Sequence, residues 1–348
     1  MIDACDRCLR RSHLVAFLAG DVQRGVPEAD PEALIAAVPA GRRADARSFL
    51  ARFDPRAARA TLGADALCGH SDSFPARLRD LPEPPAVLYS TRIGLVAGLD
   101  EPVAVVIGSR RPSEYGRTVA YGLGRGLGAA GVPVVSGLAL GIDAVAHRGC
   151  LDGDGRTVAV LASGVDVAYP RTNRRLYERI RAEGAIVSEM PPGTRPLRWL
   201  FPARNRIMAA LGQLTVVVEA AERSGTLITA DCAADIGRDV AAVPGLVTSE
   251  VAAGTNGLLR NGAALVTGPQ DVLDLLYGVG VREVPAAPEP VLDEPDRGLL
   301  ELVARGAGLD ELGREAGLPA AAVRATLARL ELRGLVRRAP SGNYVPAA

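Results

Sequence analysis

The 348-residue chain is long enough for two or three domains, and an apolar content of 48% is sufficient for a sizeable core. Its 40 basic residues are all arginines and are balanced by 40 acidic residues, so binding of a polyanion would depend on local patches. The absence of lysine excludes P-loop and Schiff-base chemistry. No apolar stretch approaches the ~20 residues that cross a bilayer, and no signal peptide is evident. We therefore expect a cytoplasmic protein without membrane contacts.

Residues 1–90 read as a helical N-terminal domain of the SAM or helix-hairpin-helix type, ending in an extended connector. Apolar residues recur three and four positions apart within 14–18, 33–38 and 44–53. Prolines at 27, 31, 39 and 55 separate these helical segments.

Five cysteines are a sparse, odd-numbered set, which is typical of a reducing compartment. Cys5 and Cys8 form a single CxxC pair, and zinc would need two further ligands. His13 is the candidate that the sequence offers nearby. We expect no metal, although the pattern leaves open whether Cys5 and Cys8 bind one.

Residues 91–278 are predicted to form a Rossmann-like domain. Continuous β-branched runs alternate with helical segments such as 113–130 and 174–182, which is typical of a mostly parallel sheet covered on both faces. The expected strands are 103–107, 132–135, 157–161, 185–187, 214–218, 240–243 and 264–266.

A linker rich in proline, alanine and glutamate follows at 279–295, and residues 296–348 resemble a winged-helix domain. Helices expected near 310–316 and 320–333 precede two short strands around a glycine-containing turn. The fold class is thus α/β with accessory domains at both ends.

The stretch 190–218 carries four arginines and no acidic residue, in a chain without net charge. Within it Arg204, Asn205 and Arg206 follow Phe201-Pro202 and precede an apolar helical run. Guanidinium groups match phosphate oxygens, so this stretch predicts an anion site, with a solvated face or an internal ion-pair cluster as the alternative.

Small and hydroxyl-bearing residues follow five of the predicted strands. Ligands of an open parallel sheet bind beyond the carboxyl ends of its strands, where backbone N–H groups can approach an anion. These loops therefore belong to one sheet edge, together with the nearby arginines. They are 108–113, 136–143, 162–173, 219–226 and 244–256.

These loops also carry a family resemblance. The motifs are Gly108-Ser109-Arg110, residues 136–147, Tyr169-Pro170-Arg171-Thr172-Asn173, residues 201–206, residues 224–230, and Pro244-Gly245 with Gly254-Thr255-Asn256. In this order, over residues 72–277, the chain resembles the DNA-processing protein A (DprA, also called Smf) family of natural transformation.

The resemblance implies a homodimeric binder of single-stranded DNA, not an enzyme, that protects incoming DNA and helps load the recombinase RecA, with no cofactor and no metal. It implies that arginines hold phosphates, that Phe201 stacks on a base, and that loop groups add neutral contacts. The implied DNA-binding residues are Ser109, Arg110, Ser136, Gly137, Gly164, Arg171, Asn173, Phe201, Arg204, Asn205, Arg206, Ser224, Gly225, Thr226 and Asn256.

Three features have structural interpretations as well as catalytic ones. Asp143 and His147 could perform acid–base work, but a helix-terminal carboxylate satisfied by its neighbours is the favoured interpretation. The glycines of 122–128 lie inside a predicted helix, which indicates close packing and not a dinucleotide site. Glu219 could pair with Arg204 or Arg206, or it could face a ligand.

Two other functions compete. Arg204, Met208 and the Ser224–Thr226 loop also resemble lysine-decarboxylase-like phosphoribohydrolases, but Thr229 stands where their catalytic glutamate is expected. Alternatively, the tail is a transcription regulator whose recognition helix presents Arg324, Arg329 and Arg333, although this helix is rich in alanine.

Overall fold

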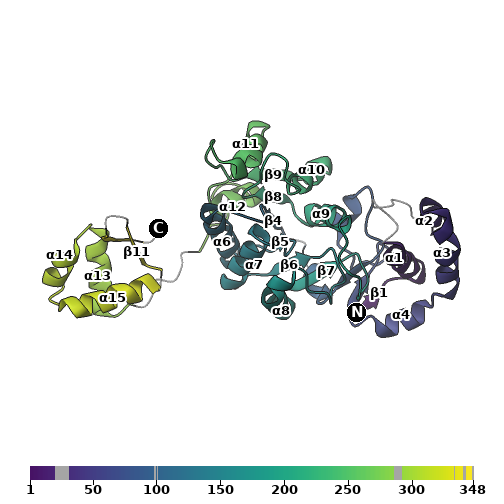
Figure 1. Cartoon of the computed structure of the whole chain (residues 1–348), viewed down its shortest axis with the longest axis horizontal. Helices are drawn as coiled ribbons and strands as arrows, with labels where there is room; N and C mark the ends of the chain where they lie inside the picture. The colour runs from purple at the N-terminus through teal and green to yellow at the C-terminus, as the bar shows by residue number, and fades with distance from the viewer. Residues whose placement is uncertain are drawn as a thin grey trace. The chain divides into compact units, whose positions relative to one another are not determined.

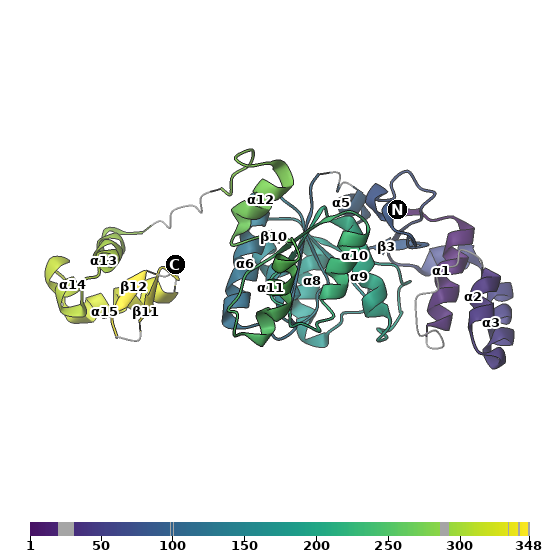
Figure 2. The same cartoon turned by 90° about the horizontal axis from the view of Figure 1, so that it is seen from above.

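The computed structural model describes residues 1–19, 31–97, 99, 101–285, 292–332, 334–339 and 342–346. These residues form two compact units, 1–285 and 286–348. The first contains a ten-stranded sheet and the second a two-stranded one (Figures 1 and 2). Among the described residues, no helix is long and apolar enough to cross a membrane.

The centre of the large sheet has the predicted parallel strands. They are β4 (Ala104–Ile107), β5 (Val134–Ser136), β6 (Thr157–Val160), β7 (Ala185–Ser188), β8 (Leu214–Val217), β9 (Asp239–Ala242) and β10 (Ala264–Leu265). Their spatial order is β7-β6-β5-β4-β8-β9-β10, and every neighbouring pair is parallel. The order reverses between β4 and β8, which makes that gap the topological switch point.

Helices cover both faces because the strands are apolar on both. On one face α6 (Glu114–Ala129), α7 (Ile142–Asp152), α8 (Arg174–Glu183) and α12 (Pro269–Tyr277) pack against side chains such as Val106 and Val216. On the other face α5 (Ile93–Ala97), α9 (Leu200–Leu211) and α10 (Leu227–Asp235) pack against Val105 and Val217. Figure 1 shows the two helical layers on opposite sides of the strands, with α11 (Ala253–Arg260) beside β9.

Two of the glycines of residues 122–128, Gly124 and Gly128, allow α6 to pack closely on α7. A Cβ at Gly124 would lie 2.3 Å from the carbonyl oxygen of Ala146, and one at Gly128 would lie 2.5 Å from that of Cys150. Helix backbones in such contact leave no room for side chains. The packing interpretation is confirmed for Gly124 and Gly128, and Gly126 makes a similar close contact with Pro269 of α12, whereas Gly122 has no atom within 4 Å of a Cβ.

The N-terminal segment contains the predicted helices and also three strands that the sequence did not reveal. The helices are α1 (Asp6–Leu18), α2 (Pro31–Ala37), α3 (Ala40–Arg52) and α4 (Pro55–Thr61). The strands β1 (Ile2–Asp3), β2 (Asp65–Leu67) and β3 (Leu88–Ser90) extend the large sheet beyond β7. The domain boundary predicted at residue 90 therefore has strands of one sheet on both sides, and it stays a prediction.

The second unit has the helices and strands expected of a winged helix: α13 (Glu294–Ala304), α14 (Leu309–Glu315), α15 (Ala320–Leu332), β11 (Val336–Arg338) and β12 (Tyr344–Pro346). The two strands are antiparallel, and Leu299, Leu327 and Val336 are among the residues of a separate buried core. Residues 286–291 of the predicted linker lie outside the described residues.

A candidate nucleic-acid interface

A cleft of about 760 Å³ opens at the switch point, beyond the carboxyl ends of β4 and β8. The loop after β4 and the loop after β8 are joined there, since Ser109 N donates to Glu219 O at 2.7 Å and Thr226 Oγ1 donates to Gly108 O at 3.0 Å. The first two turns of α9 line the opposite wall through Phe201, Arg204 and Asn205. The cleft lies where ligands of open parallel sheets are expected.

Exposed arginines and two aromatic rings surround the cleft. Arg110, Arg111 and Arg198 are all exposed, and none of them forms an ion pair within the part of the chain that the structure describes. The Arg110 guanidinium lies over the Phe201 ring at 5.4 Å, and the Tyr169 ring lies 5.7 Å from that of Phe201. The rim thus combines uncompensated positive charge with stacking surfaces.

Arg204 lies in the floor of this cleft, and its predicted direct phosphate contact stays a prediction. Its side chain is only 4% exposed, and Nη1 donates to Gly137 O at 2.8 Å and to Val160 O. Burial lowers the pKa of Arg204 to about 10, although the neighbouring Asp143 carboxylate opposes that shift. The guanidinium therefore joins the ends of β5 and β6.

Asp143 is the one carboxylate among the described residues that line the cleft, and it belongs to the same buried group. Its Oδ2 accepts from the backbone N–H of Gly137 at 3.2 Å and of Ala139 at 3.4 Å. Burial raises the pKa of Asp143, while the charge of Arg204 acts in the opposite direction. Asp143 therefore holds the loop after β5 in place. This agrees with the favoured interpretation of a carboxylate satisfied by its neighbours.

His147 lies behind this group and is fully buried. Its Nδ1 is 2.6 Å from Thr157 Oγ1. Burial, assisted by the charge of Arg204, lowers the pKa of His147 to about 3, so the ring is neutral at physiological pH. The residue does not reach the cleft.

Gly137 is present because of Arg204 and not for the approach of an anion. A Cβ at this position would lie 2.3 Å from Arg204 Nη1. Gly141, with φ of 81°, has a similar constraint, because a Cβ there would lie 2.2 Å from Ser109 O. Gly137 thus makes room for the Arg204 guanidinium, and Gly141 allows the loops after β4 and β5 to pack together.

Hydroxyl and amide groups of the predicted set do line the cleft. Ser109 Oγ accepts from Arg111 N at 3.1 Å, and Ser224 Oγ accepts from Thr226 N at 3.2 Å. Both hydroxyl protons are therefore available to a ligand, whereas the Thr226 hydroxyl donates to Gly108 O. Asn205 lines the wall, where its Oδ1 is 3.3 Å from Arg204 Nε.

Besides Gly137, five predicted residues lie outside the cleft and are satisfied by the protein or buried. Ser136 is fully buried and donates to Val106 O at 2.7 Å, and Gly164 is buried. Asn173 donates to Leu138 O at 3.0 Å, and Asn256 makes two hydrogen bonds with Gly245. Arg206 forms an ion pair with the partly buried Glu189 at 2.5 Å. These side chains shape the loops, so direct DNA contacts by them do not fit their environments.

Arg171, by contrast, is exposed at the start of a short 3-10 helix, Arg171–Asn173. It does not line the cleft, so its predicted phosphate contact would lie farther along a bound strand.

Arg111 and Arg198 are the rim residues that the predicted set lacked. Arg198 was part of the one-sign arginine stretch, and Arg111 is adjacent to the Gly108–Arg110 motif. The available signal was the acid-free stretch for Arg198 and adjacency to the motif for Arg111, and neither pattern shows which arginine is exposed.

Glu219 pairs with neither arginine considered for it. It is 3% exposed and accepts from Ser113 N at 2.9 Å and from the Ser113 hydroxyl. A Cβ at Gly116 would lie 2.4 Å from this carboxyl group. Glu219 therefore fastens the start of α6 to the end of β8.

In the winged-helix unit, α15 presents few free cations. Arg329 forms an ion pair with the buried Asp296 at 2.5 Å, and Arg333 lies outside the described residues. Arg324, Arg337 and Arg338 are exposed. The recognition-helix hypothesis thus retains one exposed arginine without an ion pair among the described residues of α15.

Comparison with known families places these observations in context. The family model described as DNA recombination-mediator protein A matches residues 65–277, and the DprA winged helix domain matches residues 283–342. The putative DNA processing protein DprA of Mycobacterium tuberculosis is 44% identical over 266 residues, 75% of this chain and 68% of the relative. Protein Smf of Escherichia coli is 37% identical over 79% of this chain and 75% of its own length.

Two solved structures resemble the fold. That of DNA processing protein A from Streptococcus pneumoniae has a TM-score of 0.64 and 32% identity, covering 77% of this chain and 93% of the other. The Helicobacter pylori structure, which addresses that protein's single-stranded DNA binding mode, has a TM-score of 0.55 and 29% identity, covering 62% and 96%. The chain belongs to the DNA recombination-mediator protein A (DprA/Smf) family.

Proposed function

We propose that the cleft binds single-stranded DNA without strong sequence preference. The observation that carries this proposal is the rim itself. Arg110, Arg111 and Arg198 are exposed there beside the Phe201 and Tyr169 rings, and they have no acidic partner among the residues that the structure describes. Arginines that follow a phosphate backbone, combined with aromatic surfaces for bases, are the recurring elements of single-strand binding. The Helicobacter pylori relative, with its single-stranded DNA binding mode, supports the choice of ligand.

We propose further that the protein acts by binding and not by catalysis. Hydrolysis of a glycosidic bond needs a carboxylate at the reacting atoms. Here Thr229 occupies the cleft position at which the phosphoribohydrolases carry glutamate, and it is buried. The Asp143 carboxylate accepts hydrogen bonds from two backbone N–H groups and interacts electrostatically with Arg204.

In the cell, the proposed role is cytoplasmic protection of incoming single-stranded DNA during natural transformation, with loading of RecA by a homodimer. We propose this role because the chain belongs to the DNA-processing family. Nuclease protection of an oligonucleotide, the solution mass of the protein, and RecA filament formation with and without the protein would test its three parts separately.

The first test is fluorescence anisotropy of a labelled oligonucleotide, single- and double-stranded, with the wild type and an Arg110→Ala/Arg198→Ala variant. Arg204 is not substituted, because its removal would disturb the buried floor. Arg260→Ala, which removes an exposed arginine from α11, is the matched control. Removing one arginine–phosphate interaction should reduce the slope of log K against log[salt] by about 0.7.

We expect a preference for the single strand, about tenfold or greater weakening in the double variant, and a slope smaller by about 1.4. The control should match the wild type. Undiminished binding by the folded double variant would move the site to the winged-helix unit, and absence of binding by the wild type would favour a nucleotide ligand.

A further inference from the structure

Four metal-ligating side chains meet at the far end of the same sheet, remote in sequence from the cleft motifs. Strands β1 and β2 are parallel, with Ile2 opposite Ala66 and Asp3 opposite Leu67. The chain therefore leaves both strands at one point: β1 continues into Cys5 and Cys8 at the start of α1, and β2 continues into Cys68 and His70. A pairing of two short strands thus unites a CxxC and a CxH motif that are far apart in the sequence.

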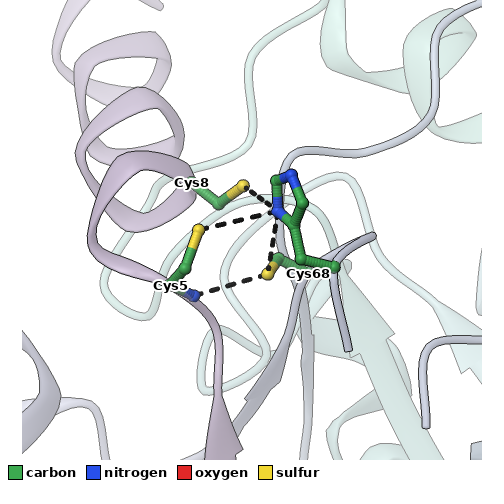
Figure 3. Close-up of side chains that lie close together, drawn as sticks. Cys5, Cys8 and Cys68 are labelled. Atoms are coloured by element: carbon green, nitrogen blue, oxygen red, sulfur yellow. Dashed lines mark hydrogen bonds between the residues drawn. The ribbon is translucent and has the colours of Figure 1, made fainter. Parts of the chain in front are cut away.

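The ligand atoms converge on a common centre. His70 Nδ1 lies 3.6 Å from Cys5 Sγ, 3.5 Å from Cys8 Sγ and 3.7 Å from Cys68 Sγ. All four atoms lie within 4.8 Å of one another. A tetrahedral zinc ion, with Zn–S near 2.3 Å and Zn–N near 2.0 Å, requires sulfur–nitrogen distances of about 3.5 Å. Figure 3 shows the sulfurs of Cys5, Cys8 and Cys68 directed toward one another.

Hydrogen bonding among these groups does not account for the arrangement. An imidazole Nδ1 has one lone pair or one proton in the ring plane, so it can satisfy one of three thiols. The three near-equal distances instead indicate a shared central partner. His13, the ligand that the sequence offered, is not part of this group: its Nδ1 donates to Leu9 O at 2.9 Å, and its ring packs on Phe53 at 4.8 Å.

We propose that Cys5, Cys8, Cys68 and His70 hold a structural zinc ion. Three thiolates and one imidazole are the donor set that zinc prefers, and four protein ligands leave no open position for a substrate. The Cys5 backbone N–H donates to Cys68 Sγ at 3.4 Å, a contact of the kind that supports metal-bound thiolates. The proposal is independent of the proposed DNA-binding function.

The ion would fasten α1 to the edge of the sheet. Beyond this cluster, α1 reaches the sheet through Ser12, whose Oγ is 3.0 Å from the Tyr89 hydroxyl. Val15, one turn later, packs against the cluster that contains Trp199 and Phe201. The zinc site therefore anchors the helix that supports one wall of the cleft from behind.

Metal content of the full-length protein, measured by inductively coupled plasma mass spectrometry after purification without added metal, tests the site. We expect about one zinc ion per chain in the wild type and less than about one tenth of that in Cys68→Ser and His70→Ala. His70→Cys, which completes a four-cysteine set, should restore binding. Cys232→Ser removes a half-buried cysteine on α10, outside the cluster, and should retain full zinc.

Cobalt substitution and thiol analysis complete the test. The wild type and His70→Cys should give the thiolate-to-cobalt charge-transfer band and the strong visible absorption of a tetrahedral site. His70→Ala should not, and because His70 is exposed this variant is expected to fold. A Cys5–Cys8 disulfide in the native protein would overturn the proposal, as would zinc content equal in the wild type and both ligand variants.

Discussion

The cleft and the cysteine cluster are both formed at the carboxyl ends of adjacent parallel strands, yet their chemistry differs. Strands β1 and β2 have the same direction as the central strands, because β3 is antiparallel to both β2 and β7. In the cleft, cations spread around a volume of about 760 Å³; in the cluster, four ligand atoms lie within 4.8 Å. Spread cations suit an extended polyanion, whereas converging soft ligands suit one ion.

This difference separates binding from stability. Substitutions of exposed rim arginines should weaken DNA binding and leave the free energy of unfolding within about 0.5 kcal/mol of the wild type. Substitutions in the cysteine cluster should lower the free energy of unfolding and weaken DNA binding far less. The floor of the cleft is the exception, since Arg204 is buried and hydrogen-bonded to the backbone although it lies in the proposed binding region.

The largest effect is expected for Arg204→Ala. It leaves the Asp143 carboxylate buried without its cation, together with the carbonyls of Gly137 and Val160. Leaving a buried charge uncompensated costs about 3–5 kcal/mol in the free energy of unfolding, measurable by urea denaturation. The double variant Arg204→Met/Asp143→Asn should recover part of that stability; effects that simply add would show that the two residues do not act as a pair.

Removal of the metal should have the next largest effect. A ligand that binds only the native state stabilises it by about 4 kcal/mol when its free concentration is about a thousand times Kd. A chelator should therefore lower the melting temperature of the wild type and of Cys232→Ser, and leave Cys68→Ser unchanged because it is already without metal. Equal shifts in all three proteins would indicate an effect of the chelator unrelated to the cluster.

A pH-dependent loss of stability is expected from His147, which has a folded-state pKa of about 3 and an ordinary pKa of about 6.5. The folded state binds fewer protons in this window, so its stability is fully present above pH 6.5 and declines as the pH falls toward 3. Within this window, the effect of His147 on the free energy of unfolding is a decrease of about 1.4 kcal/mol for each pH unit by which the pH falls. His147→Gln should have a flatter profile between pH 6 and about 4, and identical profiles would show that His147 is not buried and neutral.

The fold of the central sheet was predictable because each strand is apolar on both faces and each loop after it has a distinctive composition. The seven predicted strands correspond to β4–β10 within 2 residues at either end. The switch point between β4 and β8 was not visible in sequence, because strand order depends on which crossovers pack, and no local pattern encodes it.

The arginines show a second limit of prediction from the sequence, which concerns the direction of side chains. The sequence placed Arg204 and Arg206 in a one-sign stretch but could not tell which side chains would point inward. At helical spacing, Arg204 projects into the sheet end and Arg206 onto Glu189, while Arg198 precedes the helix and remains exposed. Burial separates the exposed rim arginines from the buried or paired ones.

The cysteine cluster was not predicted, because it is brought together by strands too short to show an alternating sequence pattern. Because β1 has 2 residues and β2 has 3, neither alternation nor a β-branched run reveals them. A usable signal did exist, since Cys68-x-His70 complements the CxxC pair as a four-ligand set.

The smallest effect is expected at the aromatic rim and refines the account of the cleft. Phe201→Ala removes a base-stacking surface and the ring under the Arg110 guanidinium, and stacking is worth about 1–3 kcal/mol per base. We expect single-strand affinity to fall about tenfold with an unchanged salt slope, because every arginine that faces a phosphate is still present. Phe201→Tyr should retain affinity, and Tyr115→Ala, at an exposed aromatic outside the cleft, should match the wild type. A reduced salt slope in Phe201→Ala would mean that the ring acts by positioning Arg110 against a phosphate and not by stacking, which would make the interface electrostatic throughout.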